Sequence, residues 1–561
     1  MLPILITANA ELTVVPCTCA EARTVADQQV KSVSTRPRPE SVDSANGSYG
    51  QILKSSALIG GSQVANIAIG IVRTKAMAML LGPAGFGLFG LYGSIASLTQ
   101  SIAGMGINSS GVRQIAEAAG SGDKARIAQT AAVLRRTAVV LGLLGGALLL
   151  VFSRQVSRLT FGGTERAGAV SLLSIAVFFS LVSGGQGALI QGMRRIADLA
   201  KMNVLGAFFG VCISIPLVYF FREKGVVPSL IGVAAMAILT SWWYSRKIGV
   251  QVSTVTVTQV RQEASALLKL GSAFMASGFL TMGVAYAVRI LVLRKIGLEA
   301  TGLYQSAWNL GGFYVGVILG AMGADFYPRL TASINDKEKT NRLVNEQTLV
   351  GVLLAGPGVL ATLTFAPLVI ALLYSAKFGA AVGVLRWICL GAMLQVITWP
   401  MGFIIVAKGR QCLFLLSELA WSIIAASLAW VCVKAYGLNG AGIAFFGSYV
   451  FHGLLTYPIV RWLTGFRWST ESKQKSLVFL FLIGLVFGSF YVLPPLWAAG
   501  IGTLATFASG VYAIHVLLRL IPLDRLPRPI QRLLVGSRVY VPKLTGTAIS
   551  SRAAESRGRV R

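Results

Sequence analysis

The chain has 561 residues, of which 55% are hydrophobic and only 12% are charged, and its mean hydropathy is +0.70. A soluble protein carries roughly twice this charged fraction, so the composition excludes an ordinary soluble domain. The formal net charge of +30 is explained mainly by Lys and Arg in loops on the cytoplasmic side of a membrane. We expect no nucleic-acid partner, because no basic fold with interleaved aromatic residues accompanies this charge.

Residues 1–50 are polar and rich in Ser, Thr, Pro and Glu after a short apolar start. The stretch Leu2–Thr7 is too short for the apolar region of a signal peptide. We therefore predict a disordered cytoplasmic leader over residues 1–50.

The rest of the chain contains about fourteen apolar runs, each near the 20 residues needed to cross a bilayer. They predict an all-α integral membrane protein with two six-helix lobes and two additional C-terminal helices. The N-lobe is expected over residues 51–250, the C-lobe over 251–465, spans 13 and 14 over 466–521, and a basic cytoplasmic tail over 522–561. The bias of Lys and Arg between loops places both termini in the cytoplasm.

The two lobes are predicted from a tandem repeat of about 215 residues. Lys54 precedes Gly82 by the same 28 residues that separate Lys269 from Gly297 (82 − 54 and 297 − 269). Further pairs keep the same order: Arg113 with Arg329, Phe152 with Phe365, Val156 with Val369, Leu159 with Leu372, and Gln191-Gly192 with Lys408-Gly409. Repeated membrane units that face each other around a shared site are typical of secondary transporters.

Polar residues at helical spacing mark candidate cavity-lining faces. Asn66 lies on one face of span 1, and Gln305 and Asn309 lie on one face of span 8. The small residues beside them are equally consistent with close helix packing. An amide in hydrocarbon without partners costs several kcal/mol, which favours a wet cavity for these three residues.

Ionisable residues within spans are costly and tend to be functional. Arg73 and Arg289 continue polar faces at nearly equivalent repeat positions, so we interpret them as a cationic site for an anionic head group. A guanidinium binds phosphate oxygens in a bidentate manner, which suits a diphosphate. Snorkelling to the membrane surface remains the alternative for both residues.

Four further charges are candidates for coupling or gating. Asp325 and Arg329 form either a gate ion pair or simple interfacial charges. Arg386 and Glu418 either pair with each other or face the cavity, and Glu418 is the candidate for proton or cation coupling.

The sequence predicts no cofactor, no metal site and no catalytic residue. The six Cys include no CxxC pair, no phosphate-binding GxxxxGK[ST] motif occurs, and no large loop separates the spans. A membrane enzyme such as a polysaccharide polymerase is therefore disfavoured, as is a scaffold without transport activity.

Several motifs resemble those of oligosaccharide flippases in the multidrug/oligosaccharidyl-lipid/polysaccharide (MOP) exporter superfamily, in particular the Wzx-type O-antigen translocases. The resemblance covers about residues 51–464 and consists of Arg73-Thr-Lys with Leu81-Gly-Pro-Ala-Gly-Phe-Gly87, Met105-Gly-Ile107 before Arg113, Phe326-Tyr-Pro-Arg-Leu330, Phe365-Ala-Pro-Leu368 with Leu373-Tyr374, and Leu385-Arg-Trp387 before Ala407-Lys-Gly-Arg410.

The resemblance implies two lobes in a V and a location in the bacterial inner membrane. It implies transfer of an undecaprenyl-diphosphate-linked oligosaccharide from the cytoplasmic to the periplasmic leaflet, with Arg73 and Arg289 holding the diphosphate. A polysaccharide polymerase and a chain-length regulator are the expected partners, besides membrane lipids. Spans 13 and 14 depart from the twelve-span pattern and leave open a peptidoglycan lipid-precursor flippase. A drug/cation antiporter of the same superfamily is disfavoured, because the spans contain more Arg than Asp or Glu.

Overall fold

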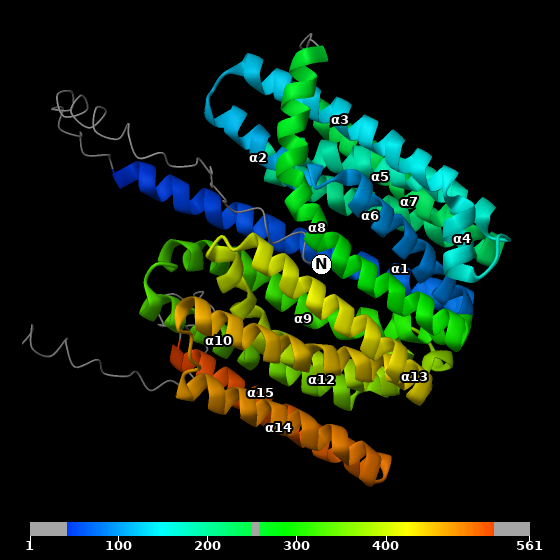
Figure 1. Cartoon of the computed structure of the whole chain (residues 1–561), viewed down its shortest axis with the longest axis vertical. Helices are drawn as coiled ribbons and strands as arrows, with labels where there is room; N and C mark the ends of the chain where they lie inside the picture. The colour runs from blue at the N-terminus through cyan, green and yellow to red at the C-terminus, as the bar shows by residue number, and fades with distance from the viewer. Residues whose placement is uncertain (1–41, 250–256, 521–561) are drawn as a thin grey trace, which may run out of the picture.

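The computed structural model describes residues 42–249 and 257–520, and all regular structure within these ranges is helical (Figure 1). The predicted tail at 522–561, and residues 1–41 of the predicted leader, lie outside the described residues. The helices are α1 Val42–Gly104, α2 Ile107–Gly120, α3 Lys124–Val151, α4 Ser153–Phe161, α5 Ala167–Gly192, α6 Ile196–Phe221, η2 Arg222–Gly225, α7 Val226–Arg246, α8 Val257–Lys295, α9 Leu298–Ser333, α10 Lys337–Thr364, α11 Ala366–Leu373, η3 Ala376–Phe378, α12 Ala381–Ala407, α13 Gln411–Thr464, α14 Thr470–Val492 and α15 Pro495–Leu520.

Nine helical stretches among the described residues are long and apolar enough to cross a membrane, and a bent helix at Leu298–Ser333 gives a tenth. Three of the nine contain two arms, because the backbone breaks at Gly82, at Arg222 and at Gly437. With these arms separated and α8 added, the helices are consistent with the predicted fourteen spans. The chain is an all-α membrane protein that crosses the bilayer several times.

The tandem repeat is visible in the backbone itself. Gly82 (φ 65°, ψ −175°) breaks α1 where Gly297 (φ 126°, ψ 178°) separates α8 from α9. Arg222 (φ 50°, ψ −128°) corresponds to Gly437 (φ 58°, ψ −137°) in the same way. Other equivalent pairs share their role at a helix boundary: Asp123 and Asp336 cap α3 and α10 through their side chains, Phe152 and Phe365 end those helices, and Arg195 and Arg410 precede α6 and α13. The repeat therefore fixes where helices turn as well as which residues recur.

The two copies of the repeated glycine motif meet each other. A Cβ on Gly302 would overlap the backbone carbonyl of Pro83, and a Cβ on Gly87 would lie 2.5 Å from the carbonyl oxygen of Leu298. Only glycine lets the two backbones approach this closely. We call this contact between residues 83–87 and 298–302 the glycine seam.

Each lobe has its own hydrophobic core. The N-lobe core packs residues such as Tyr92, Leu173 and Val177, whereas the larger core lies mainly among α9, α10, α12 and α13 and extends to Met77 and Phe86 of α1. Helices α14 and α15 pack against α10 at the outer edge of the C-lobe (Figure 1). Contact between the lobes is made mainly by α1 with α8 and α9, and also by α2, α3 and α4 with α8.

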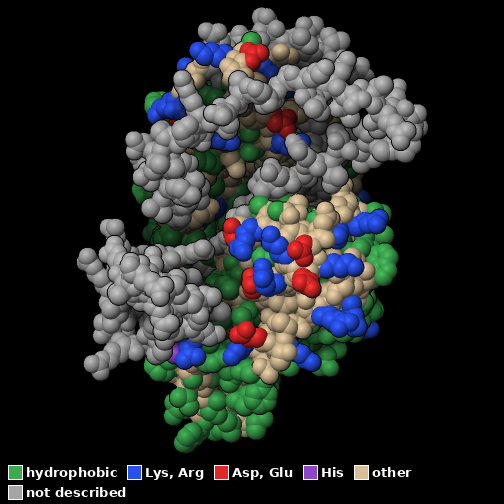
Figure 2. Space-filling view, turned by 90° about the vertical axis from the view of Figure 1, so that its left-hand side faces the viewer, with side chains coloured by type: hydrophobic (Ala, Val, Ile, Leu, Met, Phe, Trp, Pro, Cys, Tyr) green, Lys and Arg blue, Asp and Glu red, His purple; other side chains and the backbone are tan. Residues whose placement is uncertain are grey.

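The two ends of the bundle differ in charge. One end, here called the basic end, holds α2 and the α5–α6 and α12–α13 junctions with Arg194, Arg195, Lys408 and Arg410. Figure 2 looks onto this end and shows charged side chains gathered on the C-lobe face, with hydrophobic side chains at its margin. The glycine seam lies at the opposite end of the bundle, where the first arm of α1 ends at Gly82.

Candidate functional site

A cavity of about 500 Å³ lies between the two lobes. The first arm of α1 supplies one wall, α9 supplies the other, and the end of α11 closes one side. Its lining includes Asn66, Gly70, Thr74, Trp308, Asn309 and Tyr374. The small residues on α1 leave the space open, while the amides and the Tyr hydroxyl give it polar contacts. We call this space the central cavity.

Arg73 precedes the lining residue Thr74 on α1 and is not itself among the lining residues of the central cavity. Its Nε and Nη2 atoms are buried and have no hydrogen-bond partner among the described residues, and the same holds for Oδ1 of Asn66. The guanidinium stacks over Phe89, with 5.2 Å from Cζ to the ring centroid. Unpartnered N–H donors of a cation that are buried are costly for folding, and they have the chemistry to bind an anionic group.

Arg289, Gln305 and Asn309 form a hydrogen-bonded chain that ends at the central cavity. Nε of Arg289 donates to Oε1 of Gln305 over 2.5 Å, and Nε2 of Gln305 donates to Oδ1 of Asn309 over 2.7 Å. Arg289 also donates to the carbonyl of Ala285 over 2.8 Å. Only 8% of Arg289 is exposed, and Gln305 is equally buried.

Neither Arg289 nor Gln305 lines the central cavity, so the prediction that they form its wall is wrong, and their role in substrate binding stays a prediction. Arg289 and Gln305 lie behind Asn309, and Gln305 fits against Gly90 of the second arm of α1. Arg289 fixes the orientation of Gln305, which in turn presents the Asn309 amide to the cavity. Arg73 and Arg289 occupy nearly equivalent repeat positions but have different surroundings.

Asp325 and Arg329 form an ion pair of 2.9 Å within α9. Both side chains are more than half exposed, at 74% and 56%. The pair joins successive turns of one helix and does not connect the two lobes. An exposed pair of this kind contributes about 0.3–0.5 kcal/mol, which argues against a gate made by this contact.

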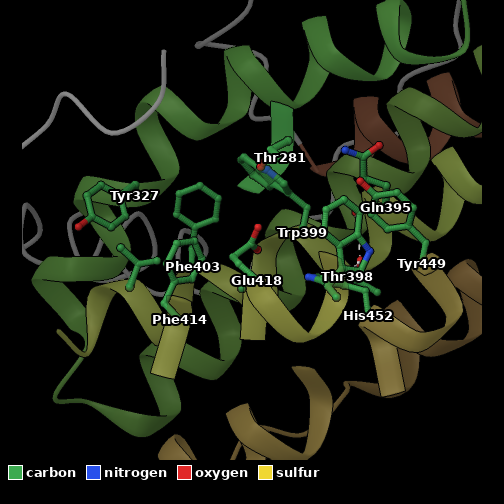
Figure 3. A pocket seen from close by; sticks show the side chains of 13 residues that line it. Thr281, Tyr327, Gln395, Thr398, Trp399, Phe403, Phe414, Glu418, Tyr449 and His452 are labelled. Atoms are coloured by element: carbon green, nitrogen blue, oxygen red, sulfur yellow. Dashed lines mark hydrogen bonds between the residues drawn. The ribbon is translucent and has the colours of Figure 1, made fainter. Parts of the chain in front are cut away.

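Glu418 lies in a second pocket of about 130 Å³, inside the C-lobe. Figure 3 shows its carboxylate surrounded by aromatic and polar side chains from α12 and α13, with Thr281 of α8 and Tyr327 of α9 nearby. Nδ1 of His452 and Oγ1 of Thr398 lie 3.3 Å apart in the same pocket. None of the ion pairs among the described residues involves Glu418.

Arg386 does not pair with Glu418, which was one of the two alternatives for these residues. Arg386 lies near the start of α12, where its guanidinium stacks on Phe490 of α14 with 3.5 Å from Cζ to the ring centroid. Its Nε also reaches the carbonyl of Leu363 over 3.4 Å. Arg386 therefore holds α14 against the C-lobe and faces neither the central cavity nor the Glu418 pocket.

Sequence reasoning missed three aromatic residues that shape the site. Trp308 and Tyr374 line the central cavity, and Phe89 lies under Arg73. Tyr374 stood within a recognised motif, but nothing in its spacing indicated that its hydroxyl reaches Asn309. Within the described ranges, no group of His, Cys, Asp and Glu is arranged to hold a metal ion.

Comparison with known proteins decides the family. The sequence profile of the "Polysaccharide biosynthesis protein" family matches residues 76–383, more than half of the chain. The chain belongs to this family. It is also 24% identical over 408 residues to the "Lipid III flippase" of Escherichia coli K12, an alignment that covers 71% of this chain and 95% of the relative. A Shigella flexneri "Lipid III flippase" matches with the same identity and coverage.

Solved structures of the MOP superfamily share the fold. A multidrug resistance MATE transporter in an outward-facing conformation aligns with a TM-score of 0.55 and 16% identity, covering 73% of this chain and 96% of its own. The "Lipid II flippase MurJ" in an inward closed conformation aligns with a TM-score of 0.58 and 14% identity, covering 83% of this chain and 99% of its own. These matches show that the chain shares its fold with a MATE transporter of the MOP superfamily and with a lipid flippase.

Proposed function

We propose that this protein translocates a polyprenyl-diphosphate-linked oligosaccharide from the cytoplasmic to the periplasmic leaflet of a bacterial inner membrane. The diphosphate binds Arg73, the sugars occupy the central cavity, and the prenyl chain stays in the lipid. The two lobes then rock about the glycine seam, so that the cavity opens on alternate sides of the membrane. The basic end faces the cytoplasm in this proposal, as do both termini.

The observation that carries the proposal is the pair of buried, unpartnered donors Nε and Nη2 of Arg73, on the helix that forms one wall of a cavity between two repeated lobes. A phosphate oxygen pair accepts two N–H donors of one guanidinium at once, which matches the two free donors of Arg73. The relatives named "Lipid III flippase" add support, because the alignment with this chain spans 95% of their length.

Two alternatives share the fold. A peptidoglycan lipid-precursor flippase is supported by the MurJ match. This match covers 83% of the chain, against 73% for the MATE transporter, as expected if α14 and α15 have counterparts there. A drug/cation antiporter needs acidic groups to hold a cation, whereas the lining of the central cavity includes no Asp or Glu among the described residues.

We further propose that the glycan is an O-antigen or exopolysaccharide repeat unit, handed to a polymerase and a chain-length regulator.

A binding measurement tests the proposal with a short substrate analogue. Farnesyl diphosphate and farnesyl monophosphate are titrated onto the purified protein in detergent. We expect the diphosphate to bind at least about tenfold more tightly, a difference of about 1.4 kcal/mol. Equal binding of both, or tighter binding of an organic cation such as ethidium, would exclude the proposed head-group site.

Ion coupling is assigned in this proposal to Glu418. When a carboxylate in a mostly apolar pocket gains or loses a proton or cation, the charge within that pocket changes, and with it the free energy of the packing around it. The pocket is formed by both arms of α13 together with α8, α9 and α12, so occupancy of Glu418 can alter how these helices pack. Rearrangement of these helices changes the angle between the lobes.

Replacement of Glu418 by Gln keeps the size of the side chain but removes its titration. We expect gradient-driven transport to fall about tenfold, or 1.4 kcal/mol in activation free energy, while farnesyl diphosphate binding stays unchanged. The matched control is Glu346→Gln, because Glu346 is exposed on α10 and pairs with Arg342. A Glu418→Gln protein that still responds fully to an imposed gradient would remove Glu418 from coupling.

A further inference from the structure

A separate basic groove lies on the N-lobe, away from both pockets described above. It has a volume of about 280 Å³ and lies between α3 and α7, with α5 as its floor. Arg135 of α3 and Arg246 of α7 supply its charge, and Gln186 and Ser245 supply neutral polar groups. No Asp or Glu is among its described lining residues.

The two guanidinium groups are available for an anion. No ion pair among the described residues involves Arg135 or Arg246. Arg246 stacks on Trp242 with 4.5 Å from Cζ to the ring centroid, which orients its planar donors without using them. Gln186 accepts a hydrogen bond from Ser241 over 2.6 Å, and this bond holds the floor of the groove in place.

The groove continues into an apolar, outward-facing strip. Val139 and Trp242 line the groove and are themselves exposed, at 37% and 45%. Along the same helix, the exposed side chains Val140, Leu143 and Leu144 extend away from the basic end. In a membrane this strip contacts lipid chains, since α3 lies at the outer side of the N-lobe (Figure 1).

We propose that this groove binds an anionic phospholipid of the surrounding bilayer. The phosphate accepts hydrogen bonds from Arg135 and Arg246, and the acyl chains lie along Val139, Val140 and Leu143. Basic pockets between membrane helices at the cytoplasmic side have the chemistry that anionic head groups require. The bound lipid links α3 to α7, which lie on opposite sides of α5, and so stiffens the N-lobe as a single unit. This proposal does not depend on the function proposed for the central cavity.

The test compares phosphatidylglycerol with phosphatidylcholine on the delipidated, full-length protein in detergent. Lipid retention by native mass spectrometry and the thermal unfolding midpoint are both measured. We expect phosphatidylglycerol to be retained at least about tenfold more strongly and to raise the midpoint. In Arg135→Gln/Arg246→Gln this preference should disappear, whereas Arg342→Gln/Arg461→Gln, on exposed parts of the C-lobe, should keep it.

A second variant leaves the charges in place. Val139→Trp fills the groove and should weaken phosphatidylglycerol binding to the same degree, so the test stands even if the double Arg variant folds poorly. Unchanged phosphatidylglycerol preference in both variants would overturn the proposal. Loss of farnesyl diphosphate binding in the Arg variant, with phosphatidylglycerol binding intact, would also overturn it and assign the groove to the transported lipid.

Discussion

Replacement of Arg73 by Met is expected to abolish most transport and, at the same time, to make the protein more stable. The Nε and Nη2 atoms of Arg73 are buried without hydrogen-bond partners among the described residues, so removing its charge relieves a folding cost. Exchange of a buried ionic group for a similar apolar one stabilises by about 1–4 kcal/mol in favourable cases. Loss of a charge-assisted bond worth about 1.5–3 kcal/mol should slow transport about 10- to 150-fold.

The opposite signs of the two effects separate a binding role from a structural one. Transport is measured in proteoliposomes or cells, and stability is measured as the thermal unfolding midpoint in detergent. The matched control is Arg342→Met, because Arg342 is exposed on α10 and its pair with Glu346 spans 3.7 Å. A large fall in the unfolding midpoint of Arg73→Met would show that Arg73 serves folding and not substrate binding.

Addition of one methyl group at Gly302 is expected to disrupt the glycine seam. The new Cβ would overlap the carbonyl of Pro83, and a backbone carbonyl cannot rotate out of the way as a side chain can. Overpacking of this kind costs about 1–3 kcal/mol. The cost appears although Ala is a better helix former than Gly by about 1 kcal/mol. We expect Gly302→Ala to lower the unfolding midpoint and to reduce transport about tenfold, in line with such a cost.

The control for this substitution lies on the same helix. Gly320 has nothing within 4 Å of the position of an added Cβ, so Gly320→Ala should be neutral or slightly stabilising. Gly87→Ala should behave like Gly302→Ala. The double variant should lose less stability than the sum of the two single losses. The first methyl group already forces the two backbones apart at this contact, so the second one costs less. Simple additivity would mean that the two glycine motifs do not meet.

The repeat made the architecture predictable from sequence. Residues that recur at the same spacing, such as Gly82 with Gly297 and Phe152 with Phe365, are the ones that set backbone breaks and helix ends. Their conformations depend on local chain geometry, which the sequence records directly. Asn66 and Asn309 line the central cavity and Gln305, on the same polar face as Asn309, does not, because helical spacing fixes the side on which a residue lies but not its depth. Their role in substrate binding stays a prediction.

The errors concern which neighbour a charged residue meets. Arg386 lies near the start of α12 and Glu418 near the start of α13, and successive antiparallel helices put these two starts at opposite ends. The turn at Lys408–Arg410 could have excluded that pairing from sequence alone. The burial of Arg289 could not be predicted in this way, because it depends on how closely Gly90 lets Gln305 approach across the lobes.

The most direct test of the central claim is the leaflet position of the lipid-linked oligosaccharide in spheroplasts lacking this protein. A membrane-impermeant sugar probe reports the periplasmic leaflet. The account predicts that the glycolipid accumulates out of reach of the probe. Expression of the wild-type chain, but not of Arg73→Met, should restore its exposure. Normal exposure of the glycolipid in the absence of this protein would contradict the claim that this protein moves it across the membrane.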